Sequence, residues 1–266
     1  MKIDQLVQFL HRTAPLSLQE DYDNAGLIVG SPDTEISGVL ICLDAIESVV
    51  DEAIILNCNL IIAHHPIIFR GLKKLNGTNY IERTVIKALK NDIAIFAIHT
   101  NLDNVILSGV NTKIAEKLKL TDTSLLAPKP GIYHDGNPVG SGMIGSLTGI
   151  FTADSFMEYL KDKMELNIVK HTELCMPYIR RVAICGGSGG FLLKEAKQQG
   201  ADIFITSDFK YHEYFDADGE IIIADIGHFE SEKYTIELLY ELIINNFSTF
   251  AAHCTKIITN PIKYFQ

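Results

Sequence analysis

Apolar residues recur along the chain in two alternating patterns, one typical of buried strands and one typical of helices. Continuous apolar runs at residues 38–45, 60–65 and 93–100 predict strands that are buried on both faces. The intervening segments 47–57 and 80–92 carry apolar residues at helical spacing. This β-α-β-α-β order predicts parallel strands that are joined by right-handed crossovers.

The same alternation returns after a polar interruption. Residues 111–120 predict another helix, and residues 126–145 are dense in proline, glycine and polar side chains, as in a link between domains. We therefore expect an α/β protein of two lobes, each with a largely parallel or mixed sheet flanked by helices. The first lobe is expected to contain residues 1–126 with 222–266, and the second residues 127–221.

The two lobes share a pattern. Residues 180–208 align with residues 37–65 without a gap, at a constant offset of 143 positions, so residues 207–208 fall on the histidine doublet 64–65. Either an internal duplication or the common physical constraints of a β-α-β unit explains this register. Both explanations place polar residues at the carboxyl ends of parallel strands, where ligands gather in open α/β sheets.

Composition and charge narrow the classes of function. Hydrophobic residues make up 47% of the chain and charged residues 21%, which is ordinary for a globular domain. The formal net charge of -10, without a dense basic cluster, argues against a nucleic-acid partner. The start of the chain lacks an apolar signal core, no apolar run has membrane-spanning length, and the five cysteines show no CxxC spacing. We therefore expect a cytoplasmic protein without a membrane partner.

Ionisable side chains stand at the end of, or directly after, three apolar runs, at residues 60–65, 93–98 and 220–227. Each alone is ordinary, but burial of so many such groups without partners would be costly. The two adjacent histidines should diverge, because neighbouring side chains of a strand point to opposite faces. Imidazoles and carboxylates together suit Zn, Fe, Mn or Ni better than an ion that prefers thiolates, and they leave the choice among these four open. The residues are His64, His65, His99, Asp103, His228 and Glu232.

Five short motifs resemble a known family. They are DNAGLIVG at 23–30, AHHPIIF at 63–69, HTNLD at 99–103, TSDFKYHE at 206–213 and GHFESE at 227–232. In this order they resemble the signature motifs of the GTP cyclohydrolase I type 2 homolog family, also known as the NGG-interacting-factor-like proteins. The resemblance covers nearly the whole chain and implies a dinuclear metal centre in a cleft between two α/β lobes. It also implies a ring-shaped homohexamer.

By motif position, the resemblance implies five ligands for two divalent metal ions per subunit. They are His64, His65, Asp103, His228 and Glu232. Two ions can each take one of two diverging histidines, so we expect His64 to hold mainly one ion and His65 the other. Asp103 is expected to bridge the ions, while the last two ligands complete the coordination.

Other motif residues are expected to assist. His99 is expected to support the ligands rather than to bind an ion itself. Asp23 and Asn24 form either a structural turn or hydrogen bonds to the ligands. In the second lobe, Lys210 is a candidate for a phosphate contact, with a solvated charge as the alternative, and His212 is a candidate for proton transfer.

Two classes of function stay open. One is a metal-dependent hydrolase that uses metal-activated water on a small-molecule substrate, a nucleotide or a related heterocycle. The other is a non-catalytic metal-binding or regulatory scaffold that forms a ring. The first is favoured, because a dinuclear site with acid and base candidates nearby exceeds what a structural ion requires. The GGSGG run at 186–190 is either a phosphate-binding loop or a tight turn between strand and helix.

Overall fold

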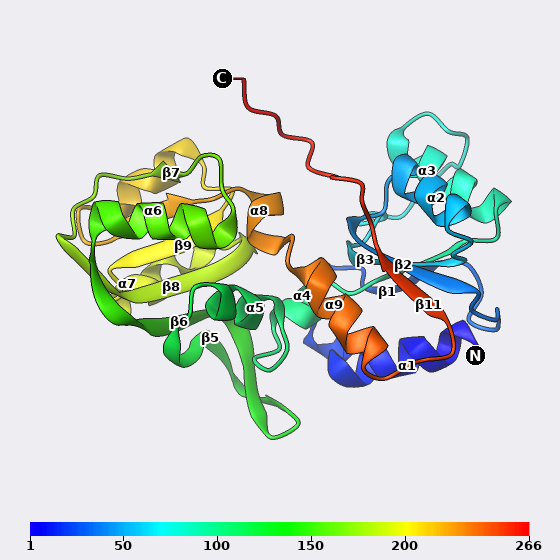
Figure 1. The fold of residues 1–266 in the computed structure, drawn as a ribbon, viewed down its shortest axis with the longest axis horizontal. Coiled ribbons are helices and arrows are strands. Elements are labelled where there is room, and N and C mark those ends of the chain that lie inside the picture. Colours follow the sequence, from blue (N-terminus) through cyan, green and yellow to red (C-terminus); the bar gives the residue numbers. More distant parts are fainter. Residues whose placement is uncertain (266) are drawn as a thin grey trace. The chain divides into compact units, whose positions relative to one another are not determined.

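The structure, a computed structural model, describes residues 1–265 and consists of two compact units. The first unit contains Met1–Leu102 and the chain from Thr235 onward, and the second contains Asp103–Tyr234. Each unit has its own β-sheet, its own helices and its own buried core (Figure 1). The protein is therefore an α/β protein of two lobes, as the sequence predicts.

The first unit is built on a five-stranded mixed sheet with the order β1-β4-β3-β2-β11. The three apolar runs of the sequence form its centre and pair in parallel, as predicted. The edge strand β1 pairs antiparallel with β4, and β11 pairs parallel with β2. The strands are β1 (Gly26–Val29), β2 (Gly38–Asp44), β3 (Leu60–His65), β4 (Ala94–Ala97) and β11 (Ala251–Cys254).

Helices cover both faces of this sheet (Figure 1). On one face, α2 and α3 bury the cluster that includes Leu40, Ile61 and Ile95. On the other face, α9 packs beside β2, and α1 carries His11 against the ring of Phe96. The helical segments of this unit are α1 (Ile3–Thr13), η1 (Leu16–Leu18), α2 (Glu47–Ile55), α3 (Tyr80–Lys90), α4 (Thr100–Asp103, whose last residue belongs to the second unit) and α9 (Thr235–Ile244).

The second unit has a six-stranded mixed sheet with the order β5-β6-β8-β9-β10-β7. Its strands β8, β9 and β10 are parallel, whereas β5, β6 and β7 pair antiparallel. The strands are β5 (Thr121–His134), β6 (Asn137–Thr152), β7 (Lys170–His171), β8 (Tyr178–Ser188), β9 (Ile203–Ser207) and β10 (Ile222–Asp225).

Residues 126–145 differ from the prediction. They form most of the antiparallel hairpin of β5 and β6 instead of a link between domains. The hairpin turns at Asp135 and Gly136, which both have positive φ values of 48° and 78°, as a two-residue hairpin loop of this kind requires. The hairpin belongs to the second sheet, and the preceding helix at residues 110–117 packs on β6 and β8 of that sheet. The second unit therefore already begins at Asp103 rather than at the expected residue 127.

The helices of the second unit pack on both faces of its sheet. Because α8 packs on β8 and β9, this unit extends to Tyr234 rather than ending at residue 221. The helical segments are α5 (Val110–Lys117), α6 (Ala153–Met164), η2 (Gly190–Leu192), α7 (Leu193–Gln198), η3 (Tyr211–Ala217) and α8 (His228–Glu232). Throughout residues 1–265, no helix has both the length and the apolar character needed to cross a bilayer.

The β-α-β segments that align in sequence also share their pairing register. Val39 lies opposite Leu60 between β2 and β3, and Val182 lies opposite Ile203 between β8 and β9, with both partners shifted by 143 positions. The next two pairs follow the same shift. The agreement ends after Ile184, where β8 contains a register shift that β2 lacks. The gapless alignment therefore describes hydrogen-bonded pairing as well as sequence.

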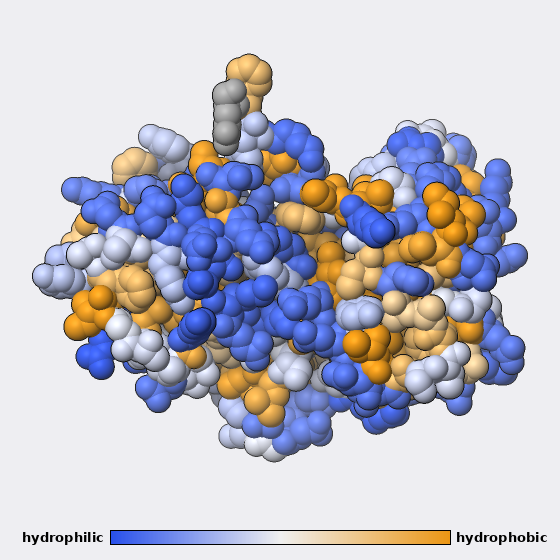
Figure 2. All heavy atoms as spheres, in the orientation of Figure 1, coloured by the Kyte–Doolittle hydropathy of each residue, from blue (hydrophilic) through white to orange (hydrophobic). Residues whose placement is uncertain are grey.

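The face of the protein in Figure 2 carries hydrophobic side chains scattered among hydrophilic ones. Large exposed hydrophobic residues occur in both units, including Ile55, Phe69, Tyr133 and Phe191. Scattered apolar side chains are ordinary on a protein surface, because polar groups cannot cover all of it.

The buried carboxylate of Glu82 closes the loop before α3 and gives the first prediction. Its oxygens accept hydrogen bonds from the N–H groups of Asn76 and Thr78, at 3.1 and 3.0 Å, and from Nδ2 of Asn79 at 2.9 Å. The N–H of Thr78 in particular holds the pKa of Glu82 below its ordinary value of 4.5. A lowered folded pKa stabilises the fold above the unfolded pKa, and this stabilisation is lost as the pH falls below it.

We therefore expect Glu82→Gln to be less stable than wild type at neutral pH, and the difference to shrink on acidification. Urea unfolding of both proteins between about pH 6 and about pH 3 measures this difference. A difference that stays constant over the whole range would contradict the assigned role of the carboxylate.

Candidate metal centre

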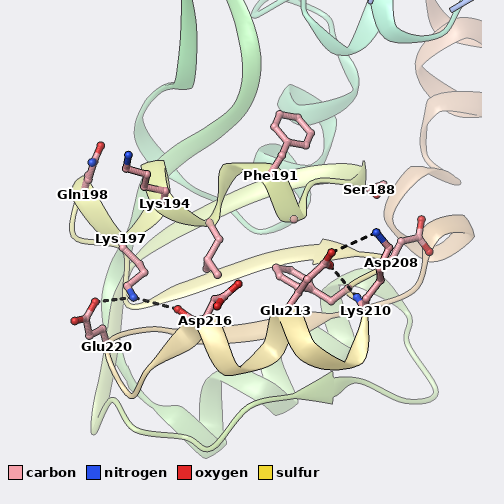
Figure 3. Close-up of a pocket in the computed structure, with 13 residues that line it drawn as sticks. Ser188, Phe191, Lys194, Lys197, Gln198, Asp208, Lys210, Glu213, Asp216 and Glu220 are labelled. Atoms are coloured by element: carbon pink, nitrogen blue, oxygen red, sulfur yellow. Dashed lines mark hydrogen bonds and ion pairs between the residues drawn. The ribbon is translucent and has the colours of Figure 1, made fainter. Parts of the chain in front are cut away.

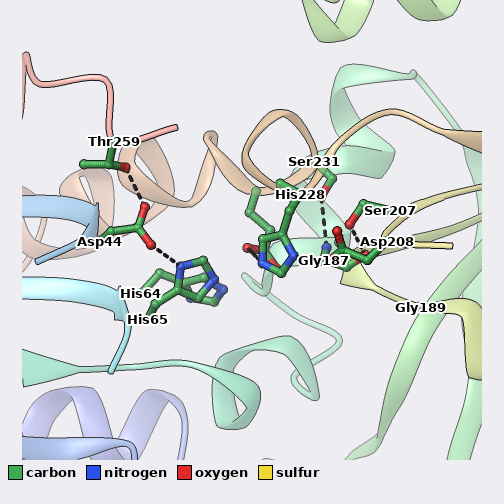
Figure 4. Close-up of polar contacts among 12 residues, drawn as sticks. Asp44, His64, His65, Gly187, Gly189, Ser207, Asp208, His228, Ser231 and Thr259 are labelled. Carbon is green, nitrogen blue, oxygen red and sulfur yellow. Dashed lines mark hydrogen bonds and ion pairs between the residues drawn. The ribbon is translucent and has the colours of Figure 1, made fainter. Parts of the chain in front are cut away.

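The histidine doublet ends β3 in the first unit, and each imidazole has an acceptor at Nδ1. Nδ1 of His65 lies 2.8 Å from Oδ1 of Asp44, its register partner on β2 (Figure 4). Nδ1 of His64 lies 2.8 Å from the carbonyl oxygen of Ile98. An acceptor at Nδ1 favours the tautomer that carries its proton there, so Nε2 becomes the nitrogen that can bind a metal ion.

His99 joins the doublet as a third imidazole. Its ring lies 5.3 Å from the rings of both His64 and His65, and its Nδ1 lies 2.8 Å from Oδ1 of Asp23. One ligand nitrogen from each of the three residues lies within 4.8 Å of the others. The rings of His64 and His65 are 4.9 Å apart, so the doublet converges on one cluster instead of diverging as the alternation along a strand predicts. Three imidazoles whose Nδ1 atoms face acceptors are a donor set that fits a divalent ion such as Zn²⁺.

Two side chains of the DNAG segment at residues 23–26, Asp23 and Asn24, form hydrogen bonds at or near this cluster. The second carboxylate oxygen of Asp23 accepts hydrogen bonds from the hydroxyl and the N–H of Thr100, at 2.5 and 3.0 Å. Burial raises the pKa of Asp23, but the hydrogen bond and charge of His99 outweigh burial and lower the pKa to about 2. Asn24 donates from Nδ2 to the carbonyl of Ile68, 2.6 Å away, and so fixes the chain after the doublet.

Asp44 and Thr259 are functional candidates that the sequence reasoning missed. The hydroxyl of Thr259 donates to Oδ2 of Asp44 at 2.5 Å, while the other oxygen faces His65 (Figure 4). The signal for Asp44 was present, because it ends an apolar run next to the run that His65 ends. No such signal marks Thr259, which lies 215 positions away from Asp44.

In the second unit, His228 lies between two carboxylates. Its Nδ1 is 2.6 Å from Oδ2 of Asp208 (Figure 4). Its Nε2 is 3.0 Å from Oε2 of the buried Glu232, one turn later on α8. Burial lowers the pKa of His228, but the hydrogen bonds and charges of both carboxylates outweigh it and raise the pKa to about 11. A metal ion bound by His228 would therefore displace a proton from it.

The glycine run of the second unit packs against this pair. Gly187 has a φ of +67°, and a Cβ built there would lie 2.3 Å from Oε1 of Glu232. Its N–H donates to the hydroxyl of Ser231 at 2.9 Å, and its carbonyl accepts from the hydroxyls of Thr206 and Ser207, at 2.9 and 2.7 Å. Of the two roles left open for the run at 186–190, these contacts favour a tight turn between strand and helix rather than a phosphate-binding loop.

Asp103 is held near the same part of the second unit. Asn111 donates from Nδ2 to the carbonyl oxygen of Asp103 at 3.3 Å and accepts from the N–H of Gly186 at 3.0 Å. Burial raises the pKa of the buried Cys185 thiol, and the charges of Asp103 and Glu232 raise it further. Both carboxylates therefore lie near this thiol. The sequence reasoning missed Asn111, because it appeared only as a residue of a predicted helix.

Lys210 and His212 lie on the segment around η3. Lys210 is 85% exposed, its ammonium lies 3.5 Å from Oε1 of Glu213, and it lines an open cavity of about 850 Å³ together with Asp208 (Figure 3). The exposed ring of His212 contacts Tyr211 and stacks on Phe215 instead.

Comparisons with known proteins agree with the motifs. The model of the family described as Duf34/NIF3 (NGG1p interacting factor 3) matches residues 1–261. A Campylobacter jejuni protein named GTP cyclohydrolase 1 type 2 homolog is 32% identical over the full length of both chains. A solved Staphylococcus aureus structure has a TM-score of 0.90 at 31% identity, and a Bacillus cereus protein related to NIF3 has 0.91 at 26%. Both cover 100% of this chain and 99% of the other.

Proposed function

Because the chain belongs to the Duf34/NIF3 family, we propose that it is a metal-dependent hydrolase that acts on a nucleotide or a related small heterocycle. The observation that carries this proposal is the imidazole cluster, in which ring nitrogens of His64 and His65 lie within 4.8 Å of each other and of a ring nitrogen of His99. The name GTP cyclohydrolase 1 type 2 homolog, given to several relatives, supports hydrolysis of a heterocycle as the reaction class.

Five residues would hold two divalent ions per chain in this proposal. They are His64, His65, Asp103, His228 and Glu232. His64 would hold mainly one ion and His65 the other, and Asp103 would be a ligand of both. The donor set suits Zn, Fe, Mn or Ni. When bound, such ions lower the pKa of a coordinated water toward neutrality and supply the nucleophile.

Neighbouring carboxylates orient the imidazoles of the proposed site. Asp44 and Asp23 hold Nδ1 of His65 and of His99, and Asp208 holds Nδ1 of His228. We assign His99 a positioning role, because its ring lies against both members of the doublet and Asp23 fixes its orientation.

Two residues of the second unit are proposed to act on the substrate directly. Lys210 is proposed to meet a phosphate group, because its ammonium is exposed at the edge of the cavity of Figure 3. His212 is proposed to transfer protons, because its imidazole is exposed and imidazole is the commonest general acid and base in enzymes.

A basic loop after the doublet supports an anionic substrate. Residues 66–75 contain Arg70, Lys73 and Lys74 and no acidic residue, although the chain as a whole has a net charge of -10. Within residues 1–265, none of these three cations forms an ion pair. The ring of Phe69 packs edge-on against the ring of His99 at 5.6 Å, so the loop begins at the imidazole cluster. Cations without carboxylate partners are available to phosphate oxygens.

The variant Asp103→Ala tests the shared ligand. We expect it to retain fewer than two ions per chain by elemental analysis, because the carboxylate that both ions use is gone. Turnover of nucleotides and phosphoesters by the metal-loaded protein should fall by about 100-fold or more. The control is Asp154→Ala, which removes an exposed carboxylate from the first turn of α6.

Each outcome of this experiment separates the alternatives. Two ions retained by Asp103→Ala would refute the shared role, and turnover that survives the substitution would point to a contaminating enzyme. Metal retention without turnover of any substrate would favour the non-catalytic scaffold. The ring-shaped homohexamer is part of the same proposal, and sedimentation measurements test it.

A further inference from the structure

The chain after β11 lies as a strap over the first unit. The hydroxyl of Thr255 donates to the carboxylate of Glu52, and the N–H of Lys256 donates to Oε1 of the same residue at 2.8 Å. Ile257 packs against the core beneath, and the side chain of Thr259 is nearly buried on Asp44. Residues 255–259 are therefore fixed at successive points rather than loosely attached.

Thr259 forms one of two matching relays that end on the imidazole cluster. In one relay, Thr259 donates to Oδ2 of Asp44 at 2.5 Å, and Oδ1 of Asp44 lies 2.8 Å from Nδ1 of His65. In the other, Thr100 donates to one oxygen of Asp23 at 2.5 Å, and the other oxygen lies 2.8 Å from Nδ1 of His99. The same order of hydroxyl, carboxylate and imidazole therefore occurs twice.

The two relays differ in where their threonine comes from. Thr100 directly follows His99 in the chain, so that relay is local. Thr259 is 215 positions from Asp44 and belongs to the C-terminal strap. The relay to His65 is therefore complete only when the end of the chain is in place.

We propose that Thr259 is a positioning residue for His65, and that the C-terminal strap thereby sets the affinity of the first unit for its metal ion. This inference rests on the proposed function in one respect, namely that His65 binds an ion. The carboxylate of Asp44 is one-third exposed, and the hydroxyl of Thr259 fixes its rotation. A fixed Asp44 holds the proton of His65 on Nδ1 and leaves Nε2 as the ligand atom.

Metal affinity and imidazole tautomer together test this role. Zn²⁺ affinity is measured by competition with a chromophoric chelator for wild type, Thr259→Val and Thr259→Ser. We expect Thr259→Val to bind about 10- to 100-fold more weakly, and Thr259→Ser to stay within about twofold of wild type, because serine retains the hydroxyl. The control Thr255→Val removes a different hydroxyl of the strap, the one that donates to Glu52, while the N–H of Lys256 still holds the strap there and Thr259 still donates to Asp44. It should also stay within about twofold.

The tautomer of His65 gives a readout that needs no metal. Long-range proton–nitrogen NMR of the metal-free protein should show the proton of His65 on Nδ1 in wild type and in Thr259→Ser. It should show a mixture of tautomers in Thr259→Val, while thermal unfolding reports whether each variant is folded. Unchanged Zn²⁺ affinity together with an unchanged tautomer in folded Thr259→Val would overturn the inference. A protein that binds no Zn²⁺ would refute the proposed function, whereas the tautomer would still decide the role of Thr259.

Discussion

The double variant His64→Ala/His65→Ala is expected to lose its bound metal and any metal-dependent turnover. Both imidazoles have Nδ1 at an acceptor, so Nε2 of each is directed to ligand binding, and alanine supplies no replacement donor. Removal of a direct ligand should cost at least the roughly 100-fold in affinity that loss of a supporting residue can cost. Elemental analysis after purification and Zn²⁺ titration measure the loss.

The control for this variant is His11→Ala. His11 lies in the same unit and also packs on an aromatic ring, that of Phe96 at 5.6 Å, but it belongs to α1 rather than to the imidazole cluster. It should retain the wild-type metal content, while both variants keep the circular dichroism of the folded protein. Wild-type affinity in the doublet variant would mean that the cluster does not hold the ion.

The central strands of both sheets could be predicted because they are buried on both faces. Such strands are continuous apolar runs, and β2 and β3 begin and end close to the runs at 38–45 and 60–65. The edge strands β1, β7 and β11 are short and partly exposed, so no run marks them. Their pairing partners are distant in sequence, and only the assembled sheet determines them.

The hairpin of β5 and β6 was missed for a related reason. Proline and glycine are abundant there, and both are typical of links as well as of hairpins. Gly140 is required by close packing rather than by a turn, since a Cβ there would lie 2.2 Å from the carbonyl oxygen of Ala127 on β5. A requirement of this kind depends on the neighbouring strand and leaves no local pattern.

The candidate site also contains residues that a local sequence pattern marks and residues that only long-range contacts bring to it. His64, His65 and His99 could be found because each stands where an apolar run ends, and the structure brings these three together. The residues that orient them were harder to find. Thr259 reaches Asp44 only through the folded strap, and a contact over 215 positions has no periodic signature in sequence.

The variant Gly187→Ala is expected to disturb Glu232 and with it metal binding in the second unit. A Cβ at Gly187 would lie 2.3 Å from Oε1 of Glu232 and 3.4 Å from Cε1 of His228. Non-bonded carbon and oxygen atoms do not approach this closely, so the carboxylate of Glu232 must move away from its place beside His228. Metal affinity should fall by more than about tenfold, which Zn²⁺ titration of both proteins measures.

The matched control is Gly200→Ala, because it separates this contact from backbone strain. Gly200 has a φ of +69°, close to the +67° of Gly187, but a Cβ there would meet no atom within 4 Å. Both variants should lose about 1 kcal/mol of stability from the left-handed backbone. Only Gly187→Ala should also lower the pKa of His228 from about 11 toward its ordinary 6.5, since the stabilising charge of Glu232 is displaced. NMR titration of the metal-free proteins decides this point, and equal behaviour of the two variants would show that Gly187 does not keep space for Glu232.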